Sequence, residues 1–325
     1  MHAALSAALA ANPAVEPVHA VSAAAEGYTG YRGWLERLER LEAAGARLEV
    51  LGESVRGEPL FGVALGNSNA PRESLVISGL HPMEWIGVET CFALMERLSG
   101  GPPEDRELWF VPLANPDGVR RVEVNLRRGR RRMVRHNARG VDLNRNFPRY
   151  WGRFSLARWV LGPLFARGSA PASEPEVRML AERFSQAALL ARGRRLDRGL
   201  SLHSFGGVVL HPYGAFWRRT SHHSAQARAA SSVAERIGRE TGQGAYRVLQ
   251  SARWVPGFTA PGMELDWFYA EHSALSLLVE CSRRNQRLRA PAHWLEPFRW
   301  FNPADPRGLA ESLSRALEPF VRGEA

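Results

Sequence analysis

Two histidines and a glutamate in this chain have the side chains and the spacing of a metal site. His81 and Glu84 lie three residues apart, and His203 follows far downstream. Zinc binds imidazole nitrogen and carboxylate oxygen, and a catalytic zinc site has three protein ligands with a fourth position open for water. If the segment begins a helix, positions i and i+3 are neighbours and both side chains point to one side. The three residues therefore predict a catalytic zinc site.

The residues around the pair strengthen this prediction. Taken alone, a His-x-x-Glu pair also fits the start of a surface helix, where the glutamate favours the helix dipole. Residues 74–80, however, have the pattern of a buried strand that ends in a glycine turn, and residues 85–98 that of an amphipathic helix. The pair then lies at the carboxyl end of a strand, where α/β proteins place their sites.

Strand-like and helical patterns alternate along the chain, which implies a sheet covered on both faces. We expect one α/β domain with a central mixed, largely parallel twisted β-sheet of about eight strands. Residues 1–27 are expected to form an N-terminal arm, poorly ordered or helical, and residues 28–325 the catalytic domain. The expected strands are 47–51, 60–65, 74–78, 108–112, 199–203, 208–210, 244–249 and 275–281. The expected helices are 33–43, 85–98, 173–188, 222–238, 262–269 and 307–321.

Composition narrows the class of protein. The 325 residues are 45% hydrophobic, which suits one large α/β domain. No run approaches the roughly 18–20 apolar residues of a membrane span. The first 25 residues lack the basic region of a secretory signal, so a cytoplasmic location is expected while export stays open. Cys91 and Cys281 predict buried thiols in a reducing compartment.

All the basic residues are arginine, and most of the net charge lies in one segment. The absence of lysine excludes a Schiff-base lysine and a Walker A motif. Residues 120–139 hold nine arginines and one acid, so they carry +8 of the net +10. The segment has no aromatic residue for base stacking, so we interpret it as a solvated basic loop and expect no nucleic-acid or membrane partner. Such a loop can bias the local field toward an anionic chain end.

Four further motifs follow in order along the chain. They are Asn-Pro-Asp-Gly at 115–118, Arg-His-Asn-Ala-Arg-Gly-Val-Asp-Leu-Asn-Arg-Asn-Phe-Pro at 135–148, Leu-His-Ser-Phe at 202–205 and Leu-Val-Glu at 278–280. With His-Pro-Met-Glu at 81–84, they resemble the zinc carboxypeptidase family, the carboxypeptidase A/B-like metallopeptidases, from about residue 28 to 321. The resemblance implies a zinc-dependent enzyme that removes the C-terminal amino acid from a peptide.

The resemblance also implies a division of labour. One zinc ion would be held by His81, Glu84 and His203, and would activate water and polarise the scissile carbonyl. Glu280 would be the general base and then the proton donor to the leaving amine. It ends an apolar run, so we expect partly desolvated surroundings. Arg135 matches the family arginine that steadies the developing oxyanion.

Four further positions match the family's substrate-binding residues. Asn144 and Arg145 would grip the terminal carboxylate, to which arginine's planar fork is suited. Phe258 stands eight residues before Asp266, where digestive members have a tyrosine. A phenyl ring can cap the pocket but cannot donate a hydrogen bond. At the expected pocket floor, Leu265 favours an apolar or aromatic terminal side chain.

Other activities share some of these motifs. A murein-peptide peptidase cutting a γ-D-glutamyl bond to diaminopimelate also needs a carboxylate grip. An N-acyl amino-acid deacylase resembling aspartoacylase shares the His-x-x-Glu start, although the 141–147 segment fits carboxypeptidases better. A non-catalytic binding module is disfavoured because all three ligands and Glu280 are present.

Overall fold

A single eight-stranded sheet forms the centre of the protein, and it confirms the expected fold class. The structure is a computed structural model, described here for residues 2–12, 18–283 and 295–324. The strands are β1 (Arg47–Glu53), β2 (Pro59–Gly66), β3 (Arg72–Ser78), β4 (Arg106–Val111), β5 (Arg195–His203), β6 (Val208–His211), β7 (Arg247–Gln250) and β8 (Leu275–Glu280). Each of the eight expected strands overlaps one of them.

The strand order puts the parallel part of the sheet at its middle. The order is β1-β2-β4-β3-β5-β8-β6-β7. Neighbours β4, β3, β5 and β8 run parallel, whereas β1 and β2 pair antiparallel on one side and β6 pairs antiparallel with β8 on the other. Because parallel strands point the same way, β3, β5 and β8 end at one common edge.

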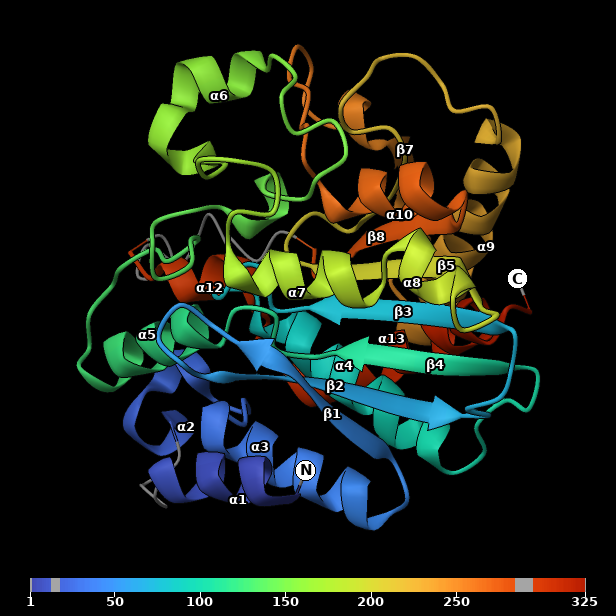
Figure 1. Ribbon diagram of the computed structural model, residues 1–325. Helices are drawn as coiled ribbons and strands as arrows, with labels where there is room; N and C mark the ends of the chain where they lie inside the picture. Colours follow the sequence, from blue (N-terminus) through green and yellow to red (C-terminus); the bar gives the residue numbers. More distant parts are fainter. Residues whose placement is uncertain (1, 13–17, 284–294, 325) are drawn as a thin grey trace.

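Helices cover both faces of the sheet (Figure 1). One face carries α4 (Trp85–Ser99), α9 (His223–Thr241) and α13 (Pro306–Arg322), with α3 (Tyr31–Ala43) packed on α4. The other carries α7 (Pro175–Arg183), α8 (Gln186–Leu190) and α10 (Glu264–His272). Figure 1 shows α7 and α8 in front of the strands and α4 and α13 behind them. No helix in the described ranges is long and apolar enough to cross a bilayer.

One glycine brings α4 close to the central strand. A Cβ on Gly87 would lie 2.8 Å from the Leu202 carbonyl oxygen, so only glycine allows this approach. Gly87 lies in the first turn of α4, and Leu202 directly precedes His203 at the end of β5. The contact therefore sets the start of α4 against the strand end that carries a predicted metal ligand.

Several expected elements differ from those observed. Residues 173–188 form two helices, because the chain breaks after Phe184 and Ser185 starts α8 by accepting a hydrogen bond from the Ala188 N–H. The last-but-one strand, β7, begins at Arg247 rather than 244. The residues after Asn115, where no helix was expected, begin with α5 (Pro116–Arg127), whose first turn is capped by the Asn115 side chain.

The first 27 residues contain short helical elements. They are α1 (His2–Ala11), α2 (Val18–Val21) and the 3₁₀ turn η1 (Ala23–Ala25). Leu5, Ala8 and Val18 are buried in the main core cluster, while residues 13–17 lie outside the described part of the chain. The remaining helices are α6 (Leu156–Leu161) and α12 (Pro297–Phe301), with 3₁₀ turns η2 (Leu143–Arg145), η3 (Gly162–Phe165) and η4 (Ser251–Arg253).

Candidate active site

Three neighbouring parallel strands deliver the predicted catalytic residues to one edge of the sheet. His203 is the last residue of β5 and Glu280 the last of β8, and the two are directly paired in register. His81 follows the end of β3 by three residues. The intervening Gly79 has φ +70°, a left-handed conformation that glycine adopts without strain. The strand ends therefore account for the meeting of residues some 200 positions apart in the sequence.

A single turn, rather than the first turn of a helix, joins His81 and Glu84. The Glu84 N–H donates to the His81 carbonyl at 3.1 Å, and Glu84 then occupies the N-cap position of α4. One Glu84 oxygen also accepts the Ser204 backbone N–H at 3.0 Å. The i, i+3 pair thus faces one side as expected, but a turn ahead of α4 makes it do so.

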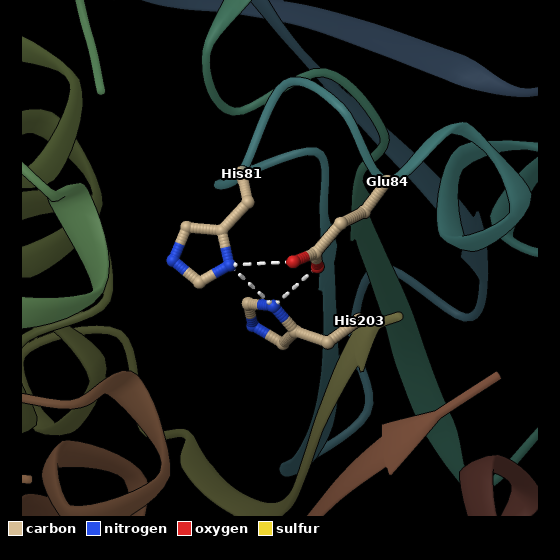
Figure 2. Close-up of side chains that lie close together, drawn as sticks. All are labelled: His81, Glu84 and His203. Atoms are coloured by element: carbon tan, nitrogen blue, oxygen red, sulfur yellow. Dashed lines mark hydrogen bonds and ion pairs between the residues drawn. The ribbon is translucent and has the colours of Figure 1, made fainter. Parts of the chain in front are cut away.

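The three predicted ligands converge on one point (Figure 2). His81 Nδ1 lies 3.0 Å from Glu84 Oε1, His203 Nδ1 lies 2.8 Å from Glu84 Oε2, and the two Nδ1 atoms are 3.1 Å apart. One ligand atom from each residue lies within 4.8 Å of the others, and all three side chains are buried. Such a set can hold one metal ion.

Each imidazole has a carboxylate on its far side. His81 Nε2 lies 3.0 Å from Asp142 Oδ1, and His203 Nε2 lies 3.1 Å from Glu264 Oε1. A carboxylate there accepts the Nε2–H of a neutral ring and leaves the Nδ1 lone pair toward the metal position. Both histidines are therefore oriented as metal ligands.

Burial and the neighbouring charges shift the pKa values in this cluster. Burial opposes ionisation of Glu84, yet the two imidazoles lower its pKa to about 2. Burial would likewise lower the pKa of His203, but Glu84 and Glu264 raise it to about 10. Without a metal, the cluster is thus held together by an ionised carboxylate and a protonated imidazole.

Glu280 occupies the same cavity in a different electrostatic state. Burial and the nearby Glu84 carboxylate raise its pKa to about 8. Its Oε2 atom is buried and has no hydrogen-bond partner among the described residues. A carboxylate oxygen left free beside a converging His-Glu-His set fits a site that takes a divalent ion together with water.

Two arginines bring positive charge to the site. Arg135 donates from Nε and Nη2 to Asp142 Oδ2 at 2.9 and 2.8 Å, so it is fixed to the carboxylate that orients His81. Arg145 follows Asn144 in η2, and burial lowers the pKa of its guanidinium. Both guanidiniums contact the Phe165 ring, whose centroid is 5.4 Å from the Arg135 guanidinium carbon and 5.1 Å from that of Arg145.

Two adjoining cavities surround these groups. The first, about 280 Å³, is lined by the three ligands, Glu280, Asn144 and Arg145, among others. The second, about 320 Å³, is mostly apolar and includes Phe258. The two cavities adjoin, because four residues line both: Arg135, Arg145, Trp254 and Met263.

The pocket floor is not where the sequence placed it. Leu265 is fully buried and packs with Leu210, Leu278 and Met263, and it is absent from the lining of both cavities. Met263, two positions earlier, presents its side chain to both. The physical reason is that α10 begins at Glu264, which turns Leu265 inward.

Comparison with known proteins decides the family. The family model described as zinc carboxypeptidase matches residues 31–300. The chain belongs to the zinc carboxypeptidase family. It is 28% identical to carboxypeptidase B of Helicoverpa zea over 50% of its own length and 40% of that relative. It is 27% identical to human carboxypeptidase A6 over 67% of its own length and 51% of that relative. The chain thus spans about half the length of these relatives.

Solved structures of carboxypeptidases share the fold. Carboxypeptidase A from Helicoverpa armigera superposes with a TM-score of 0.73 at 20% identity, covering 95% of this chain and 80% of that one. Bovine thrombin-activatable fibrinolysis inhibitor, in complex with a tick carboxypeptidase inhibitor, superposes with a TM-score of 0.72 at 19% identity. The match covers 91% of this chain and 97% of that one. These comparisons favour neither the murein-peptide peptidase nor the deacylase alternative.

In this zinc carboxypeptidase family member, the basic segment is only partly a solvated loop. Its first residues belong to α5, and five of its nine arginines form ion pairs with acids, three of them across the surface with Glu58, Glu296 and Glu174. Arg135 at its end is the one that reaches the cavity. The segment therefore has a structural role beside any effect on the local field.

Sequence reasoning missed several residues of the site. Glu264, Met263, Trp254 and Phe165 all touch the cavities or the ligands, yet none lies in a recognised motif. Of these, Glu264 carried a usable signal, since it is an acid two residues before Asp266 at the start of α10. The other three come from loops whose course the sequence does not reveal.

Proposed function

We propose that this protein is a zinc metallocarboxypeptidase that hydrolyses the C-terminal peptide bond of peptides. The observation that carries the proposal is the content of one cavity. A converging His-Glu-His set, the unpartnered oxygen of Glu280 and the guanidiniums of Arg135 and Arg145 all line it. Family membership supports the same activity.

The cavity residues divide the chemistry between them. Zinc, when bound, supplies Lewis acidity toward the scissile carbonyl and toward water. Glu280, with Oε2 free, takes a proton from the attacking water and returns it to the leaving nitrogen. Arg135, held by Asp142, keeps its positive charge beside the carbonyl oxygen as negative charge develops there.

Recognition of the chain end is assigned to Asn144 and Arg145. Both line the metal cavity, and the half-buried Arg145 guanidinium has its pKa lowered by burial. A partly desolvated guanidinium without a carboxylate in direct contact is unfavourable, and the terminal carboxylate of a peptide supplies one. This requirement makes the enzyme an exopeptidase.

The adjoining cavity points to an apolar or aromatic C-terminal side chain. Trp254, Val255, Phe258, Ala260 and Met263 line it, and it contains no carboxylate. A basic side chain buried there would have no acidic partner, which costs several kcal/mol in a desolvated site (~2–5 kcal/mol). The two arginines at its edge would repel that side chain further.

A small substrate panel tests the proposal. Zinc-loaded protein is assayed against hippuryl-Phe, hippuryl-Arg, the C-terminal amide of hippuryl-Phe, a diaminopimelate tripeptide and an N-acyl aspartate. We expect cleavage of hippuryl-Phe above hippuryl-Arg, none of the amide, and loss of activity with chelator. Preferred cleavage of either of the last two substrates would assign the activity elsewhere.

A catalytic variant gives the second arm. Glu280→Ala is expected to abolish turnover while the protein still binds one equivalent of zinc, because Glu280 lies outside the ligand set. Turnover that persists in this variant, or purified protein that takes up no zinc, contradicts the proposal.

A further inference from the structure

Glu264 contacts the ring of His203 in the same way as Asp142 contacts the ring of His81. Its side chain is fully buried at the first residue of α10, and Oε1 lies 3.1 Å from His203 Nε2. The Asp142 contact with His81 Nε2 measures 3.0 Å. The two carboxylates come from unrelated segments, Asp142 directly before η2 and Glu264 at the start of α10, and reach the two rings from their far sides.

The hydrogen-bond pattern leaves Glu264 as the acceptor that His203 needs. With Nδ1 turned to the metal position, a neutral His203 ring carries its proton on Nε2. The Glu264 N–H donates to Asn144 Oδ1, which fixes the orientation of the Asn144 amide. The amide nitrogen of Asn144 then lies 3.3 Å from His203 Nε2. An amide nitrogen donates and cannot accept, so the Nε2–H bonds to the Glu264 carboxylate.

Among the described residues, no arginine forms a direct ion pair with Glu264. Asp142 has Arg135 in two-point contact, whereas Oε1 of Glu264 contacts His203 and Oε2 has no hydrogen-bond partner among the described residues. The site contains two guanidiniums, those of Arg135 and Arg145, and four carboxylates, those of Glu84, Asp142, Glu264 and Glu280. When all six groups are ionised, their net charge is −2, which one divalent cation neutralises.

We propose that Glu264 is a positioning residue for the metal: it holds His203 in the tautomer and orientation that present Nδ1, and adds negative charge for a divalent cation. The inference rests on the proposed zinc site but not on turnover. Carboxylates behind ligand histidines contribute roughly 10–100-fold to metal affinity, so removal of Glu264 should weaken zinc binding by about that factor.

Zinc affinity and metal-free stability are measured on Glu264→Gln, which keeps an acceptor and removes the charge, and on Glu264→Leu, which removes both. Metal-free protein is titrated with zinc against a chromogenic chelator at fixed pH. We expect a roughly 10–100-fold weaker affinity for Glu264→Leu, with Glu264→Gln intermediate. The urea transition of metal-free Glu264→Gln is the control for folding: a cooperative transition shows that a loss of zinc affinity is not a loss of the fold.

Glu73 offers a matched control at the opposite end of the same sheet. It is fully buried, also has an unpartnered Oε2, and pairs with Arg194 at the start of β3. About 3.3 Å of strand per residue puts it roughly 20 Å from the site. Glu73→Gln should leave zinc affinity unchanged.

Two results would overturn the inference. One is a zinc dissociation constant within about two-fold of the parent in both Glu264 variants; the other is an equal loss in Glu73→Gln. Protein that binds zinc normally but cleaves no peptide would instead refute the proposed function and leave the role of Glu264 standing.

Discussion

Replacing Glu280 by glutamine should stabilise the metal-free protein at alkaline pH while it abolishes catalysis. In the folded protein, burial and the Glu84 carboxylate raise the pKa of Glu280 from its ordinary 4.5 to about 8. Because folding disfavours the ionised form, the folded state loses stability as pH rises from 4.5 through 8. Glutamine has nearly the same shape as the protonated acid but does not ionise.

The size of the effect follows from the two pKa values. The folded and ordinary values, about 8 and 4.5, differ by 3.5. At about 1.36 kcal/mol per pKa unit, ionisation of Glu280 costs up to about 5 kcal/mol above pH 8. The loss accumulates at about 1.4 kcal/mol per pH unit across that window. For a protein whose whole stability is of order 5–15 kcal/mol, this is a large effect.

Urea denaturation tests this pH dependence. The metal-free parent and the metal-free Glu280→Gln variant are unfolded at steps from pH 5 to pH 9. Both proteins share every other titrating group, so their difference reports on Glu280 and on its repulsion with Glu84. We expect similar unfolding free energies at pH 5 and a lead for the variant that approaches about 5 kcal/mol by pH 9. Bound zinc should shrink the lead, because its charge favours the ionised carboxylate. A difference that stays constant across pH would refute the reasoning.

Four further changes have defined outcomes. Arg145→Gln should lower kcat/KM for hippuryl-Phe roughly 10–100-fold, the worth of a charged hydrogen-bond pair, mainly through KM. Phe258→Tyr adds a donor beside the second cavity and should alter KM or kcat; no change in either would contradict its assignment as a substrate contact. Gly87→Ala drives a Cβ to 2.8 Å from the Leu202 carbonyl oxygen and should cost about 1–3 kcal/mol of unfolding free energy in thermal or urea melts. Added salt should raise KM if the basic segment 120–139 attracts anionic chain ends, and a KM independent of salt would remove that role.

The parts of the site that sequence could predict are those tied to the sheet. His203 and Glu280 end strands with a clear apolar pattern, and His81 follows another. Once three such strands are parallel neighbours, their ends must meet at one edge. The motif at 142–145 was recognisable by its resemblance to the family, and in the structure Asp142 and Asn144 contact the ligand histidines. At each of these positions the hydrophobic pattern of the sequence and the chemistry of the side chain predicted the same site.

The parts that escaped prediction depend on loop geometry. Leu265 was placed at the pocket floor by its spacing from Asp266, yet the start of α10 at Glu264 turns it into the core and leaves Met263 facing the cavity. Phe165, which contacts Arg145, lies in a connecting segment whose sequence has no hydrophobic periodicity. In such segments a shift of one or two residues exchanges buried and exposed side chains, and sequence alone does not set the register.

This division separates two properties of the proposed enzyme that variants can alter. The groups proposed to bind metal and move protons stand on strand ends and helix starts whose backbone is held by sheet pairing and by contacts such as Gly87 against Leu202. The groups proposed to contact the substrate side chain, such as Met263 and Phe258, stand on connecting segments. Changes in the connecting segments should therefore shift the preference among C-terminal side chains while zinc affinity stays constant. Changes at the strand ends should reduce zinc binding and turnover together for every substrate.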